Sequence, residues 1–219
     1  MNSMKRSSRG IPSARVSPRA FTLVEMITVV AVMATLMVIS TPYLIGTIQA
    51  NRLTSAGESL MYRLARLQQV VSTTGAPAEI RFYKFEHEGV TAYHAYQLFA
   101  HDEAANELRA LENPIYLKGD NLTMLEGQLS PLLDPASHGT TTGAWPRAAE
   151  DEPFKSMSAQ YLKVTFYPNG TTSLHTTLRN SYLTLAEEGK VAQEGSQAPP
   201  NYYTIQIDPV TGRARSYRP

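Results

Sequence analysis

Side chains suited to catalysis or metal binding are few in this 219-residue chain and poorly placed for either role. Three histidines recur every seven residues, at His87, His94 and His101. Successive side chains of a β-strand point to opposite faces, so three such positions on a strand cannot all meet at one metal ion. The chain has no cysteine, which excludes thiolate ligands, a catalytic thiol and disulfide bonds. We therefore expect no metal site and no cofactor.

The acidic residues and the serines give no better indication of an enzyme. Glu86, Glu88, Asp102 and Glu103 are typical of solvated surface charges, and nothing in their spacing implies the paired carboxylates of a glycoside hydrolase. The sequence contains neither the G-x-S-x-G turn of the α/β-hydrolases nor the G-x-x-x-x-G-K-[ST] phosphate-binding loop. We predict that the protein is not an enzyme.

Glu25 is the acidic residue whose position carries the most information. It is the only charged residue in Phe21–Ile39, where fifteen of the 19 residues are apolar and three are threonine. As a helix this segment would be about 28 Å long at roughly 1.5 Å per residue, close to the hydrocarbon thickness of a bilayer. We predict that it spans a membrane.

The residues before this segment predict its orientation. Residues 1–20 contain five Lys or Arg residues and no acid, and their Gly, Pro and Ser residues disfavour a helix, which is typical of a disordered basic leader. No further basic residue occurs until Arg52, so the positive-inside rule places the N-terminus in the cytoplasm. A secretory signal peptide fits poorly, because the apolar run continues past Pro42 into an amphipathic helix.

Two explanations of Glu25 remain open, since an unpaired carboxylate inside a membrane segment is costly. If the chain were cut before Phe21, the new α-ammonium group, on the same or a neighbouring subunit, would neutralise the carboxylate. Alternatively, Glu25 lies only one turn from the start of the segment and reaches the membrane interface.

Residues 19–26 (RAFTLVEM) resemble the type III signal of type IV pilins and type II secretion pseudopilins. The resemblance implies cleavage between Ala20 and Phe21 by a prepilin peptidase, followed by N-methylation of Phe21. It also implies that Glu25 sets the register between subunits. Pro42 falls where the family commonly has a helix-kinking proline, whereas Ala20 replaces the family's usual glycine.

The remaining sequence predicts an α+β, pilin-like fold with a long N-terminal helix and an antiparallel β-sheet head. Apolar residues at three- to four-residue spacing predict an amphipathic helix that ends near Thr74-Gly75, and Pro42 should bend the long helix. The expected parts are a cleaved leader (1–20), a transmembrane and filament-core helix (21–42), an amphipathic helix (43–75) and a β-rich periplasmic head (76–219).

Alternating and β-rich segments predict the strands of the head, and residues 134–153 and 186–201 are predicted loops. The predicted strands are Ala78–Phe85, Val90–Phe99, Ile115–Leu117, Leu122–Leu125, Tyr161–Tyr167, Thr171–Leu178, Tyr182–Leu185, Tyr202–Ile207 and Arg213–Tyr217. A turn is predicted over residues 86–89, between the first two strands.

Three stretches are similar to the minor pseudopilins of the GspH/FimT family: residues 55–82, the FYPNGT turn at 166–171 and the terminal YYTIQIDPVTGRARSY. This similarity implies a structural subunit of a type II secretion system, anchored in the inner membrane with its head in the periplasm. Its partners would be other pseudopilins or pilins, bound through the N-terminal helix, and the prepilin peptidase. The resulting filament would drive protein export.

The chain ends in a basic and aromatic stretch that contains Arg213, Arg215, Tyr217 and Arg218. In some relatives that take up DNA, a Gly-Arg-x-Arg ending is associated with DNA binding, in which arginines hold phosphates and an aromatic ring stacks on a base. The alternative function is therefore a FimT-like minor type IV pilin with a nucleic acid partner. Outward-facing arginines that protect an edge strand from aggregation are the simpler explanation.

Overall fold

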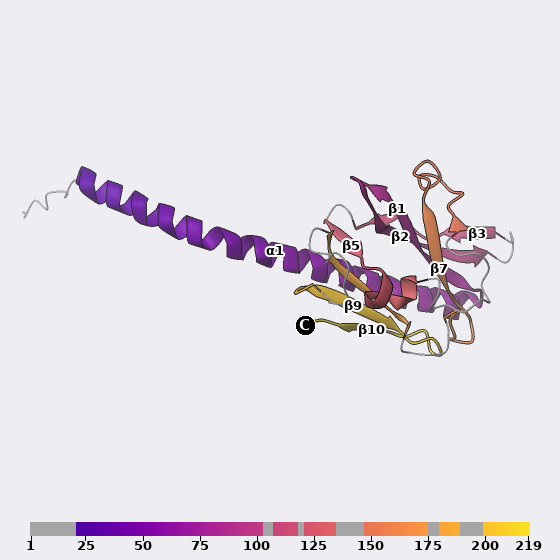
Figure 1. Ribbon diagram of the computed structural model, residues 1–219. Helices are drawn as coiled ribbons and strands as arrows, with labels where there is room; N and C mark the ends of the chain where they lie inside the picture. Colours follow the sequence, from indigo (N-terminus) through magenta and orange to yellow (C-terminus); the bar gives the residue numbers. More distant parts are fainter. Residues whose placement is uncertain (1–20, 103–106, 118–120, 135–146, 175–179, 189–198) are drawn as a thin grey trace, which may run out of the picture. The chain divides into compact units, whose positions relative to one another are not determined.

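The computed structural model describes residues 21–102, 107–117, 121–134, 147–174, 180–188 and 199–219 (Figure 1). The leader and Ala20 therefore lie outside the described residues, as do most of the predicted loops 134–153 and 186–201. The chain divides into two compact units, one that ends at Ile45 and one that runs from Gly46 to Pro219.

The expected long N-terminal helix is α1 (Leu23–Thr74), which covers nearly all of the predicted parts 21–42 and 43–75. Pro42 lies within α1 and does not end it, because a proline removes only one of the backbone hydrogen bonds that hold a long helix. The predicted C-terminus is confirmed: Gly75 has a φ of 70° and its N–H donates to Val71 O at 3.0 Å. A glycine in this left-handed conformation is a common helix terminator.

The second unit contains one antiparallel sheet, which confirms the predicted α+β layout at the level of its elements (Figure 1). Within the described ranges, its strands are β1 (Ala78–His87), β2 (Val90–Asp102), β3 (Glu107–Ala110), β4 (Ile115–Tyr116), β5 (Leu122–Met124), β6 (Arg147–Ala148), β7 (Gln160–Phe166), β8 (Tyr182–Glu187), β9 (Tyr202–Ile207) and β10 (Ala214–Tyr217). Their order is β10-β9-β8-β5-β2-β1-β7-β6, and β3 and β4 also pair with β2. Two short 3-10 helices, η2 (Gly127–Leu129) and η3 (Pro131–Leu133), follow β5.

The main core lies between α1 and the inner face of this sheet. Within the second unit, one face of α1 contributes Leu53, Ala56, Leu60, Leu64, Leu67 and Val71. These residues recur at the three- to four-residue spacing that predicted an amphipathic helix. They pack against inward side chains of alternating strand positions, such as Ile80 and Phe82 of β1.

A second, smaller hydrophobic cluster lies on the outer face of the sheet. It joins Tyr83 and Phe85 of β1 to Phe154 and Tyr161, with three buried alanines beside them. The rings of Tyr83 and Phe154 stack with their centroids 3.6 Å apart. The segment between β6 and β7 therefore covers part of the sheet's outer face, which positions residues 150–152 beside β1 and β2.

The structure corrects several predicted elements. Thr171–Leu178 is not a returning strand in its described part, where Thr172 forms only an isolated bridge with Phe166. Strand β8 continues to Glu187, into the predicted 186–201 loop, and β6 lies in the predicted 134–153 loop. The turn predicted over 86–89 is limited to Glu88 and Gly89, whose φ angles of 50° and 81° suit a two-residue hairpin connection.

Candidate functional site

The N-terminal half of α1 presents a continuous apolar surface. Every large hydrophobic side chain from Phe21 to Ile39 is exposed, with exposed fractions from 46% at Val29 to 76% at Leu23 and Val38. An 18-residue window of this helix has a mean hydropathy of 2.3 and none of it is buried. By its length and composition, the helix is thus long and apolar enough to cross a membrane.

The hydroxyl groups in this apolar half are satisfied by the helix itself. Thr28 Oγ1 donates to Val24 O at 2.8 Å, and Ser40 Oγ donates to Leu36 O at 2.7 Å. Thr35 likewise bonds the carbonyl oxygens one turn before it. Since an unpaired hydroxyl is costly in hydrocarbon, these bonds leave Glu25 as the residue in the segment that most needs a further partner.

Glu25 and Thr22 cap the start of α1 reciprocally. Glu25 N donates to Thr22 Oγ1 at 3.2 Å, and Thr22 N donates to Glu25 Oε2 at 3.4 Å. The first helical hydrogen bond runs from Met26 N to Thr22 O. This arrangement is a capping box, and the T-x-x-E spacing that specifies it is readable in the sequence. One carboxylate oxygen thus bonds a backbone N–H within the same turn.

The sequence-predicted processing and assembly residues occupy one end of the chain. Phe21 lies directly before the capping box and is 72% exposed. Glu25 follows within the first turn of α1, while Pro42 lies nearly five turns later in the same helix. The structure therefore places Phe21 and Glu25 together, and Ala20, on the other side of the predicted cut, is outside the described residues.

The C-terminal arginines do not form one open basic surface. Arg218 donates to Ala50 O of α1 at 3.3 Å and to Thr54 Oγ1. Tyr217 donates its hydroxyl to Gln206 Oε1 at 3.2 Å across the β9–β10 pair. Arg213 lines a small cavity of about 180 Å³, and Arg215 is exposed on β10.

The three histidines lie on the two strands of the first hairpin. His87 lies on β1, and His94 and His101 lie on β2. The hairpin brings the rings of His87 and His94 to a centroid distance of 6.0 Å, although the two residues lie on different strands. His94 is fully buried, with Nε2 3.9 Å from Glu188 Oε1. Among the described residues, no group of three or more metal-ligating side chains assembles.

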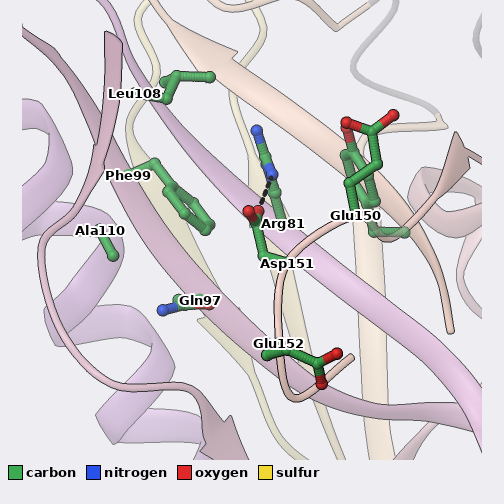
Figure 2. A pocket seen from close by; sticks show the side chains of 9 residues that line it. Arg81, Gln97, Phe99, Leu108, Ala110, Glu150, Asp151 and Glu152 are labelled. Carbon is green, nitrogen blue, oxygen red and sulfur yellow. Dashed lines mark hydrogen bonds and ion pairs between the residues drawn. The ribbon is translucent and has the colours of Figure 1, made fainter. Parts of the chain in front are cut away.

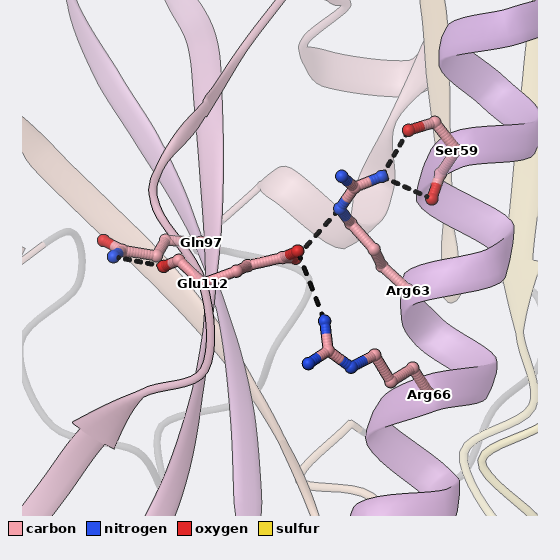
Figure 3. Close-up of polar contacts among 5 residues, drawn as sticks. All are labelled: Ser59, Arg63, Arg66, Gln97 and Glu112. Carbon is pink, nitrogen blue, oxygen red and sulfur yellow. Dashed lines mark hydrogen bonds and ion pairs between the residues drawn. The ribbon is translucent and has the colours of Figure 1, made fainter.

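A polar network that the sequence did not predict ties the segment after β3 to α1 (Figure 3). Glu112 accepts hydrogen bonds from Arg63 Nε at 2.9 Å and from Arg66 Nη1 at 3.4 Å. Arg63 also donates to Ser59 O at 3.1 Å, and Gln97 Nε2 donates to Glu112 O at 2.9 Å. Because the partners are up to 49 residues apart in the chain, no local pattern reveals this network.

Shifted pKa values in the second unit have structural causes. Burial in the outer cluster raises the pKa of Tyr83 to about 12, and burial also raises the pKa of Tyr93. The N–H groups of Val210 and Thr211 lower the pKa of Asp208 in the turn before β10. Each group therefore keeps its ordinary charge state at neutral pH.

Comparison with known proteins gives no assignment. No protein-family model, no curated protein and no solved structure matches this chain. Function is therefore inferred from the chain's own residues and their geometry.

Proposed function

We propose that this protein is a pilin-like structural subunit, namely a minor pseudopilin of a type II secretion system. In this proposal, its leader is removed before Phe21 in the inner membrane. The N-terminal half of α1 then packs with the corresponding helices of other subunits, and the head projects into the periplasm. The resulting filament drives protein export.

The observation that carries the proposal is an uncovered apolar helix with a carboxylate in its first turn. Among the described residues, nothing buries the apolar half of α1, whereas the half from Gly46 onward packs against a sheet. Removing apolar surface from water lowers the free energy by roughly 25 cal/mol per Å². Before assembly, a membrane would cover this apolar surface. After assembly, neighbouring helices would cover it by close packing.

Glu25 would supply the register that apolar packing lacks. Cleavage before Phe21 would create an α-ammonium group four residues from this carboxylate, on the same subunit or on a neighbour. An ammonium–carboxylate pair in a medium of low dielectric constant is far stronger than it is in water. Only one position along the neighbouring helix would bring the two charges together, so the pair would select one stagger between subunits.

Replacement of Glu25 by alanine tests this role. We expect Glu25→Ala to abolish co-assembly with partner pilins, measured by cross-linking in membranes, while the protein still inserts. Thr28→Val is the matched control, because the Thr28 hydroxyl already bonds Val24 O and its loss should leave assembly intact. Unchanged assembly of Glu25→Ala would remove the register role.

A minor type IV pilin that binds DNA remains the second candidate, favoured by the exposure of Arg215 and Tyr217 on β10. The change Arg213→Gln/Arg215→Gln should then weaken DNA retention and reduce the dependence of binding on salt concentration. Filter binding at several salt concentrations measures both effects. Arg218→Gln is a useful comparison, since Arg218 contacts α1. A double variant with unaltered retention would reject this candidate.

A further inference from the structure

A cavity of about 470 Å³ lies on the outer face of the sheet, opposite the face that packs on α1 (Figure 2). Its base is formed by Arg81 of β1 and Gln97 of β2, which pair directly across the two strands. Their neighbours Ile80 and Leu98 point to the inner core. One wall comes from β3, and another comes from residues 150–152, which follow β6.

Arg81 is a fixed part of this cavity and not an available cation. Its Nε donates to Glu79 Oε1 at 2.7 Å, and its guanidinium group lies 4.3 Å from the ring centroid of Phe99 and 4.6 Å from that of Tyr161. Glu79, which is 3% exposed, also binds Lys163 Nζ at 2.8 Å. The positive charge of Arg81 is thus compensated within the protein and held between two aromatic rings.

The rim of the cavity carries excess negative charge. Asp151 reaches Arg81 Nη1 at 3.4 Å, whereas Glu150 and Glu152 are exposed and form no ion pair with any residue in the described ranges. The lining residues therefore carry three carboxylates against one guanidinium group. A ligand with positive charge would be attracted to this rim.

Gln97 adds a hydrogen-bond acceptor inside the cavity. It is only 9% exposed, and its Nε2 is committed to Glu112 O at 2.9 Å. Its Oε1 accepts no hydrogen bond from the residues that the structure describes. A carbonyl oxygen accepts hydrogen bonds, so this atom suits a ligand that brings N–H groups. The side chains of Leu108 and Ala110 provide an apolar wall for the stem of such a ligand.

We propose that this cavity binds an arginine side chain presented by a partner protein. A guanidinium group offers five N–H donors in a plane, which suits simultaneous bonding to Gln97 Oε1 and to a rim carboxylate. Its three-carbon stem packs along the apolar wall formed by β3. This binding site belongs to the head and is independent of how α1 assembles.

The test uses the full chain in detergent micelles and a blocked Gly-Ser-Arg-Ser-Gly peptide, with the matched Gly-Ser-Gln-Ser-Gly peptide. We expect the arginine peptide to bind about tenfold more tightly, equivalent to roughly 1.4 kcal/mol, and its affinity to fall as salt is added. The change Glu150→Gln/Glu152→Gln should remove most of this preference. Titration calorimetry measures each affinity.

Two further variants separate the cavity from general surface charge. Glu86→Gln removes an exposed carboxylate of β1 that does not line the cavity and should leave binding unchanged. Ala110→Phe keeps every charge but fills the cavity and should abolish binding, with circular dichroism as the check of folding. Equal affinity for the two peptides, or undiminished affinity in the double variant, would overturn the proposal. Binding of free spermidine without binding of the peptide would overturn it as well.

Discussion

Glu25 has a partner in the capping box, and the proposed cleavage before Phe21 would give it a second, charged one. The capping box gives one carboxylate oxygen a bond to Thr22 N, at a rather long 3.4 Å. A new α-ammonium group at Phe21 would compete for the same carboxylate with a full charge in place of an amide dipole. The ammonium group would add the attraction between two full charges, which is strong in a medium of low dielectric constant. The cap thus holds Glu25 near the helix start without preventing it from changing partner.

Glu112 provides a residue-scale test of the packing between α1 and the head. Glu112→Gln keeps the side chain's shape but replaces two charge-assisted bonds, to Arg63 and Arg66, with weaker ones. We expect the free energy of unfolding to fall by about 1–3 kcal/mol, measured by chemical denaturation. Glu107→Gln, an exposed change on β3, should stay within about 0.5 kcal/mol.

The loss of stability in Glu112→Gln is assigned to the contact between Glu112 and Arg63 only if the two residues are energetically coupled. A double-mutant cycle with Arg63→Gln isolates this pair from other effects of either change. If the two substitutions simply added, the contact would contribute nothing to the attachment of α1.

Helix α1 and strand β9 lie close together at Gly57. A Cβ atom built on Gly57 would lie 2.6 Å from Tyr203 Cγ of β9, a distance that real side chains do not tolerate. Gly57→Ala should therefore lower the free energy of unfolding by about 1–3 kcal/mol through overpacking, despite alanine's helix preference of roughly 1 kcal/mol. Thermal unfolding in detergent measures the difference.

Gly46→Ala is the matched control in the same helix. No atom lies within 4 Å of a Cβ at Gly46, so only the helix preference remains and stability should be unchanged or higher. A Gly57→Ala protein as stable as the Gly46→Ala protein would mean that Tyr203 can move aside and that the close approach is not required.

Elements with a strong local pattern were predictable from the sequence. Strand β9 (Tyr202–Ile207) matches its predicted bounds because its side chains alternate in burial and a turn follows at once. The end of α1 was predictable because Gly75 supplies the required backbone conformation. In contrast, β3 has four exposed residues and exists as a strand through its pairing with β2, which local sequence does not encode.

Of the two sites described above, the sequence could have predicted the capping box but not the cavity. The T-x-x-E spacing of Thr22 and Glu25 could have been recognised as a capping box, because its partners lie three residues apart. The cavity around Arg81 could not have been predicted from the sequence, because its residues come from β1, β2, β3 and the 150–152 segment. His87 and His94 illustrate the cause: their proximity depends on hairpin register, which spacing along the chain does not specify.

At the scale of the whole molecule, the two units differ in how far they bury their apolar side chains. The second unit buries its own in two clusters, one on each face of the sheet. In the described part of the chain, the most apolar stretch of α1 buries none of its residues, and it is long enough to cross a membrane. Our account explains this difference by assembly: the head is complete in itself, and the apolar helix is completed by neighbouring subunits after the leader is removed.

Mass spectrometry of the protein's N-terminus, after isolation from membranes of its native host, tests this account most directly. The account predicts a mature chain that begins at Phe21 and carries a methyl group on its α-amino nitrogen. Ala20→Phe, which replaces the small residue before the cut, should leave the leader attached and prevent assembly. A wild-type chain that retains residues 1–20 while it functions in the membrane would contradict the account.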